Sequence, residues 1–137
     1  ELQAAFLSVK LTHLKEWTRQ RQEIAAWYNE ALAGIGDLIL PEVKSNATHV
    51  YHLYVIRTQY RDKLQAFLAE RGIGTLIHYP IPPHLQKAYS DLGFKEGDFP
   101  IAEELAKTSL SLPICPGMTQ AHVFLLVSRV AEFFKRV

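Results

Sequence analysis

Cysteine and net charge are both scarce in this 137-residue chain. The single cysteine, Cys115, excludes an internal disulfide and is typical of a reducing compartment, so a cytoplasmic location is expected. Fifteen Lys plus Arg against 14 Asp plus Glu leave a formal charge of +1, which argues against nucleic acid or an anionic membrane as partner. No uncharged run approaches the roughly 18 to 20 residues that a membrane-spanning helix needs.

Helix-capping signals are also missing where the sequence starts. Glu1 already lies inside an amphipathic helical pattern, without Met, without proline in the first turn, and without a capping residue ahead of it. The pattern continues to Ala33, where Gly34 and Gly36 are expected to end the helix. Such a helix would be about 45 to 50 Å long, more than one small core requires. We therefore expect the chain to be part of a longer protein, with some of this helix packed on a missing region.

The composition, with 48% hydrophobic and 21% charged residues, indicates one compact globular domain over residues 1–137. After the helix at 1–33, residues 48–137 are predicted to form an α+β core with a small three-stranded sheet packed with helices. The predicted strands are 49–57, 75–79 and 109–112. The predicted helices begin at Asp62, Leu85, Asp98 and Thr119.

The segment Gly72–His84 holds the candidate binding residues. A short β-branched strand leads directly into polar aromatics and a loop stiffened by three prolines, which hold neighbouring side chains in place at little entropic cost. His78, Tyr79 and His84 are therefore predicted to line a rigid pocket wall. Structural roles remain open for each, since His78 could cap backbone, Tyr79 could fill the core, and His84 could cap a helix or face water.

Other candidate chemistry is weaker. His49 and His52 have a ligand-like spacing, but an offset of three on a strand places two rings on opposite faces, and no H-E-x-x-H motif is present, so no metal site is predicted. Cys115 lies between two prolines without an obvious base, and is predicted to be inert. All lysines fall on charged faces, loops or termini, so none is predicted to be a Schiff-base nucleophile. No catalytic residue is predicted within this chain.

Several segments, taken in order, resemble one known family, the PLP-dependent sugar-nucleotide aminotransferases of the DegT/DnrJ/StrS group. They are ELQAAFL at Glu1–Leu7, YHLYVIR at Tyr51–Arg57, RD at Arg61–Asp62, GIGTLIHYPIPPHLQ at Gly72–Gln86, FPIAE at Phe99–Glu103, and LSLP at Leu110–Pro113 followed by PGMT. The loop HYPIPPH is most similar to enzymes that act on dTDP-linked 3-keto-6-deoxyhexoses.

The resemblance implies the small C-terminal domain of a fold-type I aminotransferase, with residues 1–33 as the interdomain helix. It further implies a homodimer in which pyridoxal phosphate (PLP) and the Schiff-base lysine belong to an N-terminal domain that is not in this sequence. The reaction implied is amino transfer from glutamate to a keto carbon of a nucleotide-linked deoxysugar. His78 and Tyr79 match the pair that lines the hexose pocket, His84 is the third substrate-binding candidate, and no cofactor-binding residue can be carried over. The chain alone should be inactive.

Two other functions remain open at this point. The parent protein could be a non-catalytic regulator of the same family that senses PLP or a sugar. Alternatively, the chain could be a helical protein-interaction module whose long first helix pairs with a partner. A Schiff-base lysine ahead of Glu1 would favour the enzyme, whereas a stable domain that needs no further sequence would favour the module.

Overall fold

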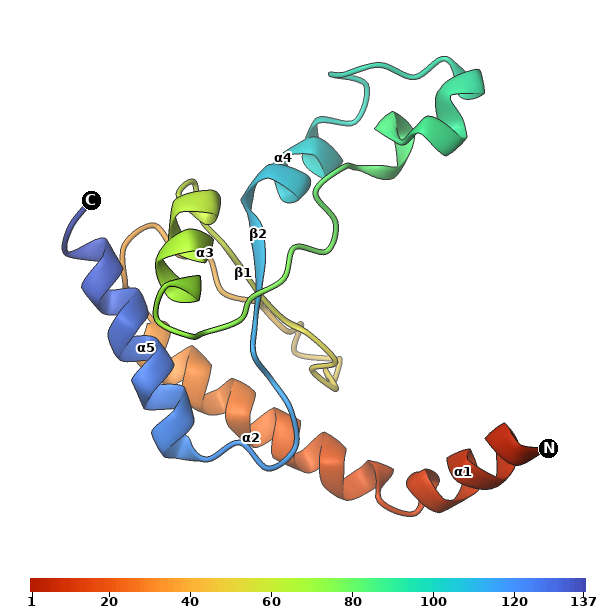
Figure 1. Cartoon of the computed structure of the whole chain (residues 1–137), viewed down its shortest axis with the longest axis vertical. Helices are drawn as coiled ribbons and strands as arrows, with labels where there is room; N and C mark the ends of the chain where they lie inside the picture. Colours follow the sequence, from red (N-terminus) through yellow and green to blue (C-terminus); the bar gives the residue numbers. More distant parts are fainter.

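The computed structural model describes residues 1–137, and its architecture is α+β, as predicted. The elements in chain order are α1 (Leu2–Leu11), α2 (Leu14–Leu32), β1 (Tyr54–Arg57), α3 (Arg61–Ala69), the 3₁₀ turns η1 (Pro83–Leu85) and η2 (Lys87–Leu92), α4 (Pro100–Thr108), β2 (Ser109–Leu112) and α5 (Gln120–Phe134). The strands β1 and β2 pair antiparallel, with Tyr54 opposite Leu112 and Arg57 opposite Ser109. Figure 1 shows α2, α3 and α5 gathered around this strand pair.

The core lies between the strand pair and these three helices. It is a cluster of 15 buried residues to which α2 contributes Ile24, Ala25, Tyr28 and Leu32. Helix α5 adds Val123, Leu126, Val130 and Phe133 at the three- and four-residue spacing of one helix face. Burial of each large aliphatic side chain contributes about 1.5–3 kcal/mol, so this cluster dominates the stability of the domain.

The first helix is not continuous, which corrects the prediction for residues 1–33. Helix α1 ends at Leu11 and α2 begins at Leu14, with a turn between them. At the break the Thr12 hydroxyl donates to the carbonyl of Val9 at 2.7 Å, and His13 N–H bonds to Lys10 O, three residues back. Thr and His are weak helix formers, and such side-chain bonds compete with the regular helical pattern. The helix end was predicted correctly, because α2 stops at Leu32 just before Gly34 with a φ of +73°.

The sheet has two strands rather than the predicted three. Only Leu76 of the predicted strand 75–79 pairs with β2, through an isolated bridge to Ser111, before the chain turns away toward Pro80. Proline has no N–H to continue a ladder. The predicted strand at 49–57 shortens to β1, because Tyr51 has a φ of +48° and its carbonyl accepts from the Arg21 side chain instead of from a neighbouring strand.

The predictions for β2 and for the start of α5 are confirmed. Strand β2 has the predicted bounds, and Thr119 caps α5 in a reciprocal arrangement with His122. The helix predicted from Leu85 is instead the pair of 3₁₀ turns η1 and η2, which ends at Gly93 as expected. Residues 80–99 form a separate tip beyond α4, shown in green and teal in Figure 1.

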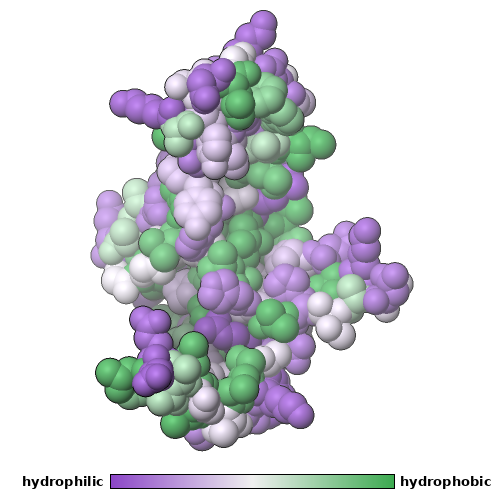
Figure 2. Space-filling model, turned by 90° about the vertical axis from the view of Figure 1, so that its right-hand side faces the viewer, coloured by the Kyte–Doolittle hydropathy of each residue, from purple (hydrophilic) through white to green (hydrophobic).

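Helix α1 and the tip both extend from the body of the molecule. Figure 2 looks onto the side toward which α1 points, and hydrophobic atoms gather there at the lower end, over α1, and at the upper end, over the tip. No residue of α1 is buried. The exposed apolar side chains include Leu2, Phe6, Leu7 and Leu11 in α1, and Tyr79, Ile81, Leu92 and Phe94 in or beside the tip. None of the helices combines the length and apolar character needed to cross a membrane.

Candidate functional site

His78 and Tyr79 lie between Leu76, which bridges to Ser111 of β2, and Pro80. At this point the segment turns away from the sheet. Their rings meet edge to face with centroids 5.6 Å apart, and the peptide bond between them is cis. Tyr79 is 70% exposed and His78 is half-buried, so neither ring fills the hydrophobic core. A hydrogen bond to β2 holds the His78 ring in place, because its Nδ1 lies 2.9 Å from the Ser111 hydroxyl.

A small hollow of about 170 Å³ lies beside His78. Its wall combines apolar side chains such as Leu76 with the polar groups of His52, Thr75, His78 and Ser111. The Thr75 hydroxyl is buried and has no hydrogen-bond partner in the protein. That hydroxyl is covered by the protein, so the side chains of His52 and His78 are the ones in this wall that offer hydrogen-bonding groups to a ligand.

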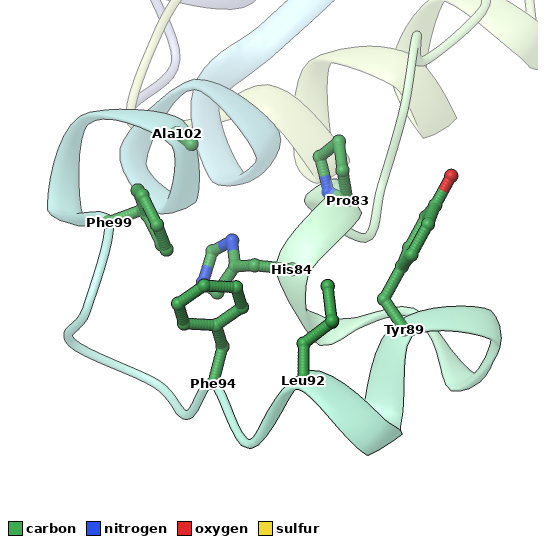
Figure 3. Close-up of a pocket in the computed structure, with 7 residues that line it drawn as sticks. All are labelled: Pro83, His84, Tyr89, Leu92, Phe94, Phe99 and Ala102. Carbon is green, nitrogen blue, oxygen red and sulfur yellow. The ribbon is translucent and has the colours of Figure 1, made fainter.

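His84 lines a different hollow, shown in Figure 3, of about 360 Å³. Its other walls are mostly apolar and aromatic, and come from Pro83, Tyr89, Leu92, Phe94, Phe99 and Ala102. The His84 and Phe99 rings are 4.8 Å apart, and Phe94 meets Phe99 edge to face at 5.1 Å. The structure therefore brings His78 and Tyr79 together, but it places His84 in a separate apolar hollow within the tip.

Glu103 holds the His84 ring and was not among the predicted site residues. Its Oε1 lies 3.0 Å from His84 Nε2 and also accepts from the backbone N–H groups of Gly97 at 2.9 Å and Phe99 at 3.4 Å. Both side chains are almost fully buried, with 7% of His84 and 9% of Glu103 exposed. Burial alone raises the pKa of the Glu103 carboxyl, but the donors from Gly97, His84 and Phe99 outweigh it and hold that pKa below its usual value.

A sequence signal for Glu103 existed but was read differently. Pro100 marks the first turn of α4, and an acid in a first turn can reach back to free N–H groups. We predicted Asp98 as the start of this helix, whereas α4 begins at Pro100 and Asp98 accepts from Lys95 N–H in the preceding turn. The link from Glu103 to His84 joins residues 19 positions apart, which local sequence patterns do not reveal.

The lysines of this chain do not have the surroundings of a Schiff-base nucleophile. A Schiff-base lysine needs a desolvated amine, and every lysine is exposed: Lys10, Lys15, Lys44, Lys63, Lys87, Lys95, Lys107 and Lys135. No group of three or more His, Cys, Asp or Glu side chains is arranged to hold a metal ion. His49 Nδ1 instead accepts from Tyr51 N–H at 2.9 Å, and His52 lies in the hollow beside His78. No step of chemistry can be assigned to a cofactor bound by this chain alone.

The comparison with protein families tests the resemblance inferred from the sequence motifs. The model of the DegT/DnrJ/EryC1/StrS aminotransferase family matches residues 1–131. The chain belongs to this family. The resemblance inferred from the sequence motifs is thereby confirmed.

Similar proteins include one named as a regulator and others named as transaminases. A "pleiotropic regulatory protein" of Geobacillus stearothermophilus is 47% identical over 137 residues, which covers 98% of this chain and 37% of that protein. A dTDP-3-amino-3,6-dideoxy-alpha-D-galactopyranose transaminase of Aneurinibacillus thermoaerophilus is 45% identical, covering 97% of this chain and 36% of that protein. The crystal structure of S. venezuelae DesV in complex with a ketimine intermediate matches with a TM-score of 0.94 and 41% identity, over 98% of this chain and 36% of that one.

These matches confirm the α+β fold of the chain. They also show that it spans only about a third of the length of the relatives it matches.

Proposed function

We propose that this chain is the substrate-side part of a PLP-dependent aminotransferase. The reaction would transfer an amino group from glutamate to a keto carbon of a dTDP-linked deoxysugar. Membership of the aminotransferase family supports the reaction class, and the 45% identity to a named dTDP-sugar transaminase supports the substrate class.

The observation that carries the proposal is the placement of His78 and Tyr79. They form an accessible pair of hydrogen-bonding rings beside a hollow, where the sequence places a proline-stiffened loop. An imidazole and a phenol together offer donors and acceptors for sugar hydroxyls, and Ile81 and the prolines add an apolar wall. Their role here is to bind and orient the hexose, not to perform the bond-breaking step.

His84 has a more indirect role in this proposal. Its Nε2 already pairs with Glu103, so this nitrogen is not free for substrate. The ring instead anchors η1 to α4 and shapes the apolar hollow of the tip. We therefore propose that His84 does not contact the substrate directly and acts through the position of the tip.

PLP supplies the electron sink for amino transfer when it is bound. In this proposal the cofactor and its lysine are held by a region outside these residues, and that region packs on the face that carries the apolar side chains of α1 and the tip. Two observations support this arrangement: the relatives are about three times as long as this chain, and exposed apolar side chains gather on one side of the molecule at both α1 and the tip. A homodimer and a cytoplasmic location remain predictions.

The double substitution His78→Ala with Tyr79→Phe tests the proposal. In the protein that joins this chain to its PLP-binding region, we expect sugar turnover to fall at least about tenfold, because two hydrogen bonds to the hexose are lost. Cofactor absorbance should be unchanged. The control substitution Tyr60→Phe removes a partly exposed phenol in the body of the domain, which packs against Phe133 and Phe134, and should leave turnover unaltered. Normal turnover by the double variant would refute the role of the pair.

The regulator alternative has less support. One relative is named a regulatory protein, but another is named a transaminase, and the DesV structure holds a ketimine intermediate. The same assay separates the two functions. If the protein binds PLP and the nucleotide sugar but no amino group moves from glutamate, the regulator is correct.

A further inference from the structure

Ser111 is the buried residue on which His78 rests. It lies in β2 with 5% of its surface exposed, opposite Val55 of β1. Both of its backbone groups are satisfied by Leu76, since Ser111 N–H donates to Leu76 O at 2.8 Å and Leu76 N–H donates to Ser111 O at 3.2 Å. The hydroxyl is therefore the only polar group of Ser111 that is free to act on a neighbour.

That hydroxyl has a single protein partner, His78 Nδ1, at 2.9 Å. Two arrangements of hydrogen are compatible with this distance. If Nδ1–H donated to Ser111, the hydroxyl hydrogen would need a second acceptor, and no other protein atom accepts it. If the hydroxyl donates to the Nδ1 lone pair, both groups are satisfied. Buried donors in proteins are almost always paired, so the second arrangement is favoured.

We propose that Ser111 is a positioning residue that holds neutral His78 as the Nε2–H tautomer. The proton on Nε2 then becomes a fixed donor, because the hydrogen bond that one ring nitrogen makes determines the state of the other. His78 Nε2 has no partner within the protein, and the edge-to-face contact with Tyr79 supports the ring from its side. This inference rests on the proposed function, and it assigns His78 the task of donating to an oxygen of the sugar.

The His78 and Tyr79 rings can then bind the same sugar hydroxyl in different roles. An imidazole N–H can only donate, whereas the Tyr79 phenol can donate or accept. A sugar hydroxyl that accepts from His78 can therefore donate its own hydrogen to Tyr79. A substrate in which that oxygen is replaced by hydrogen leaves the His78 Nε2–H without an acceptor, so such an analogue should bind less well.

Nitrogen-15 NMR of histidine-labelled protein tests the tautomer without any substrate. At about pH 9, where an ordinary imidazole is neutral, we expect the His78 Nε2 signal to be that of a protonated nitrogen and the Nδ1 signal that of an unprotonated one. A predominant Nδ1–H form, or an equal mixture of the two, would overturn the inference. Absence of turnover in wild-type protein would sink the proposed function and leave this result unaffected.

Substitutions then test what Ser111 contributes. Ser111→Ala should give a mixture of tautomers and raise the KM for the nucleotide sugar about two- to tenfold, the loss expected for one hydrogen bond, with PLP absorbance unchanged. Ser111→Thr keeps the hydroxyl and should restore the single tautomer. Ser109→Ala is the matched control, because Ser109 is buried on the same strand and its hydroxyl has no hydrogen bond to His78. If Ser111→Ala keeps the wild-type tautomer and KM, Ser111 is not the positioning residue.

Discussion

Single residues that join distant parts of the chain decide the geometry of the tip. Glu103 collects three donors, and two of them, Gly97 N–H and Phe99 N–H, lie in the turn that precedes α4. The third, His84, comes from η1 on the other side of the hollow. One carboxylate oxygen, Oε1, therefore links η1 to the start of α4 by accepting from all three donors.

Glu103 should make the stability of the protein sensitive to acid. Its pKa is lower in the folded state than the usual value of about 4.3 for an unfolded glutamate, so its contribution is fully present above that pH. The contribution is lost as the pH falls through the folded value, when the carboxyl takes up a proton and stops accepting from the backbone. Urea denaturation of Glu103→Gln over a series of acidic pH values should show a flatter loss of stability below about pH 4.3.

The control for this experiment is Glu96→Gln. Glu96 is largely exposed and pairs only with Lys107 at the surface, where such pairs contribute little. Its stability curve should follow the wild type. An equally steep acid limb in Glu103→Gln would show that this carboxylate is not responsible.

At the level of the elements, the capping signals at Thr119, Gly34 and Gly93 were correct, whereas the helix start predicted at Asp98 was wrong. Thr119 begins α5, and the two halves of the reciprocal cap are His122 N–H to the Thr119 hydroxyl at 3.4 Å and Thr119 N–H to His122 Nδ1 at 3.2 Å. The turns at Gly34 and Gly93 also lie where they were predicted, with φ values of +73° and +74°. These signals act over a few residues, so they do not depend on the rest of the fold.

The cap of α5 can be tested by substitution. Thr119→Ala should lower the free energy of unfolding by about 1 kcal/mol, the typical cost of a lost N-cap. Thr119→Ser keeps the accepting oxygen and should stay within about 0.5 kcal/mol of wild type, as surface substitutions usually do. Urea titration gives both values. A full-sized loss in the serine variant would point to the threonine methyl group rather than the cap.

At the scale of the whole molecule, the chain has a packed body and two extensions, α1 and the tip, that bury few or none of their side chains. The body is held by α2, α3, α5 and the strand pair, whereas α1 buries no residue. The tip is similarly exposed, since Leu92 and Phe94 face solvent at its surface. The apolar surfaces of α1 and of the tip lie on the same side of the molecule (Figure 2), and this is the side that we propose contacts the PLP-binding region.

This division predicts very different costs for two leucine substitutions. Leu7, in α1, is 64% exposed, and Leu32, at the end of α2, is 0% exposed. In the isolated chain, Leu7→Gln should change the free energy of unfolding by less than about 0.5 kcal/mol. Leu32→Ala should cost about 2–5 kcal/mol, because it leaves a cavity in the core. Equal losses, measured by urea denaturation, would mean that α1 packs against the body in solution.

The predictions from sequence failed where the structure depends on contacts between distant residues or on a local break in a regular pattern. Helices with an apolar stripe and a clear cap were predicted, but the break at Thr12 was missed because the apolar spacing runs through it. The third strand was predicted from β-branched residues at 75–79, yet pairing depends on a partner strand, and only Leu76 meets one. His84 was placed among the substrate-binding candidates, although its attachment to Glu103 depends on how the tip folds back on α4.

The sequence alone determined the α+β class, the family, the end of α2, the start of α5, and the position of His78 and Tyr79 next to a proline-rich loop, since these depend on local residue types and ordered motifs. Only the tertiary structure decided how many strands pair, which hollow each histidine enters, and that His78 rests on Ser111. The physical reason is distance along the chain. The partners in the His78–Ser111 bond are separated by 33 residues, and only the folded chain brings them together.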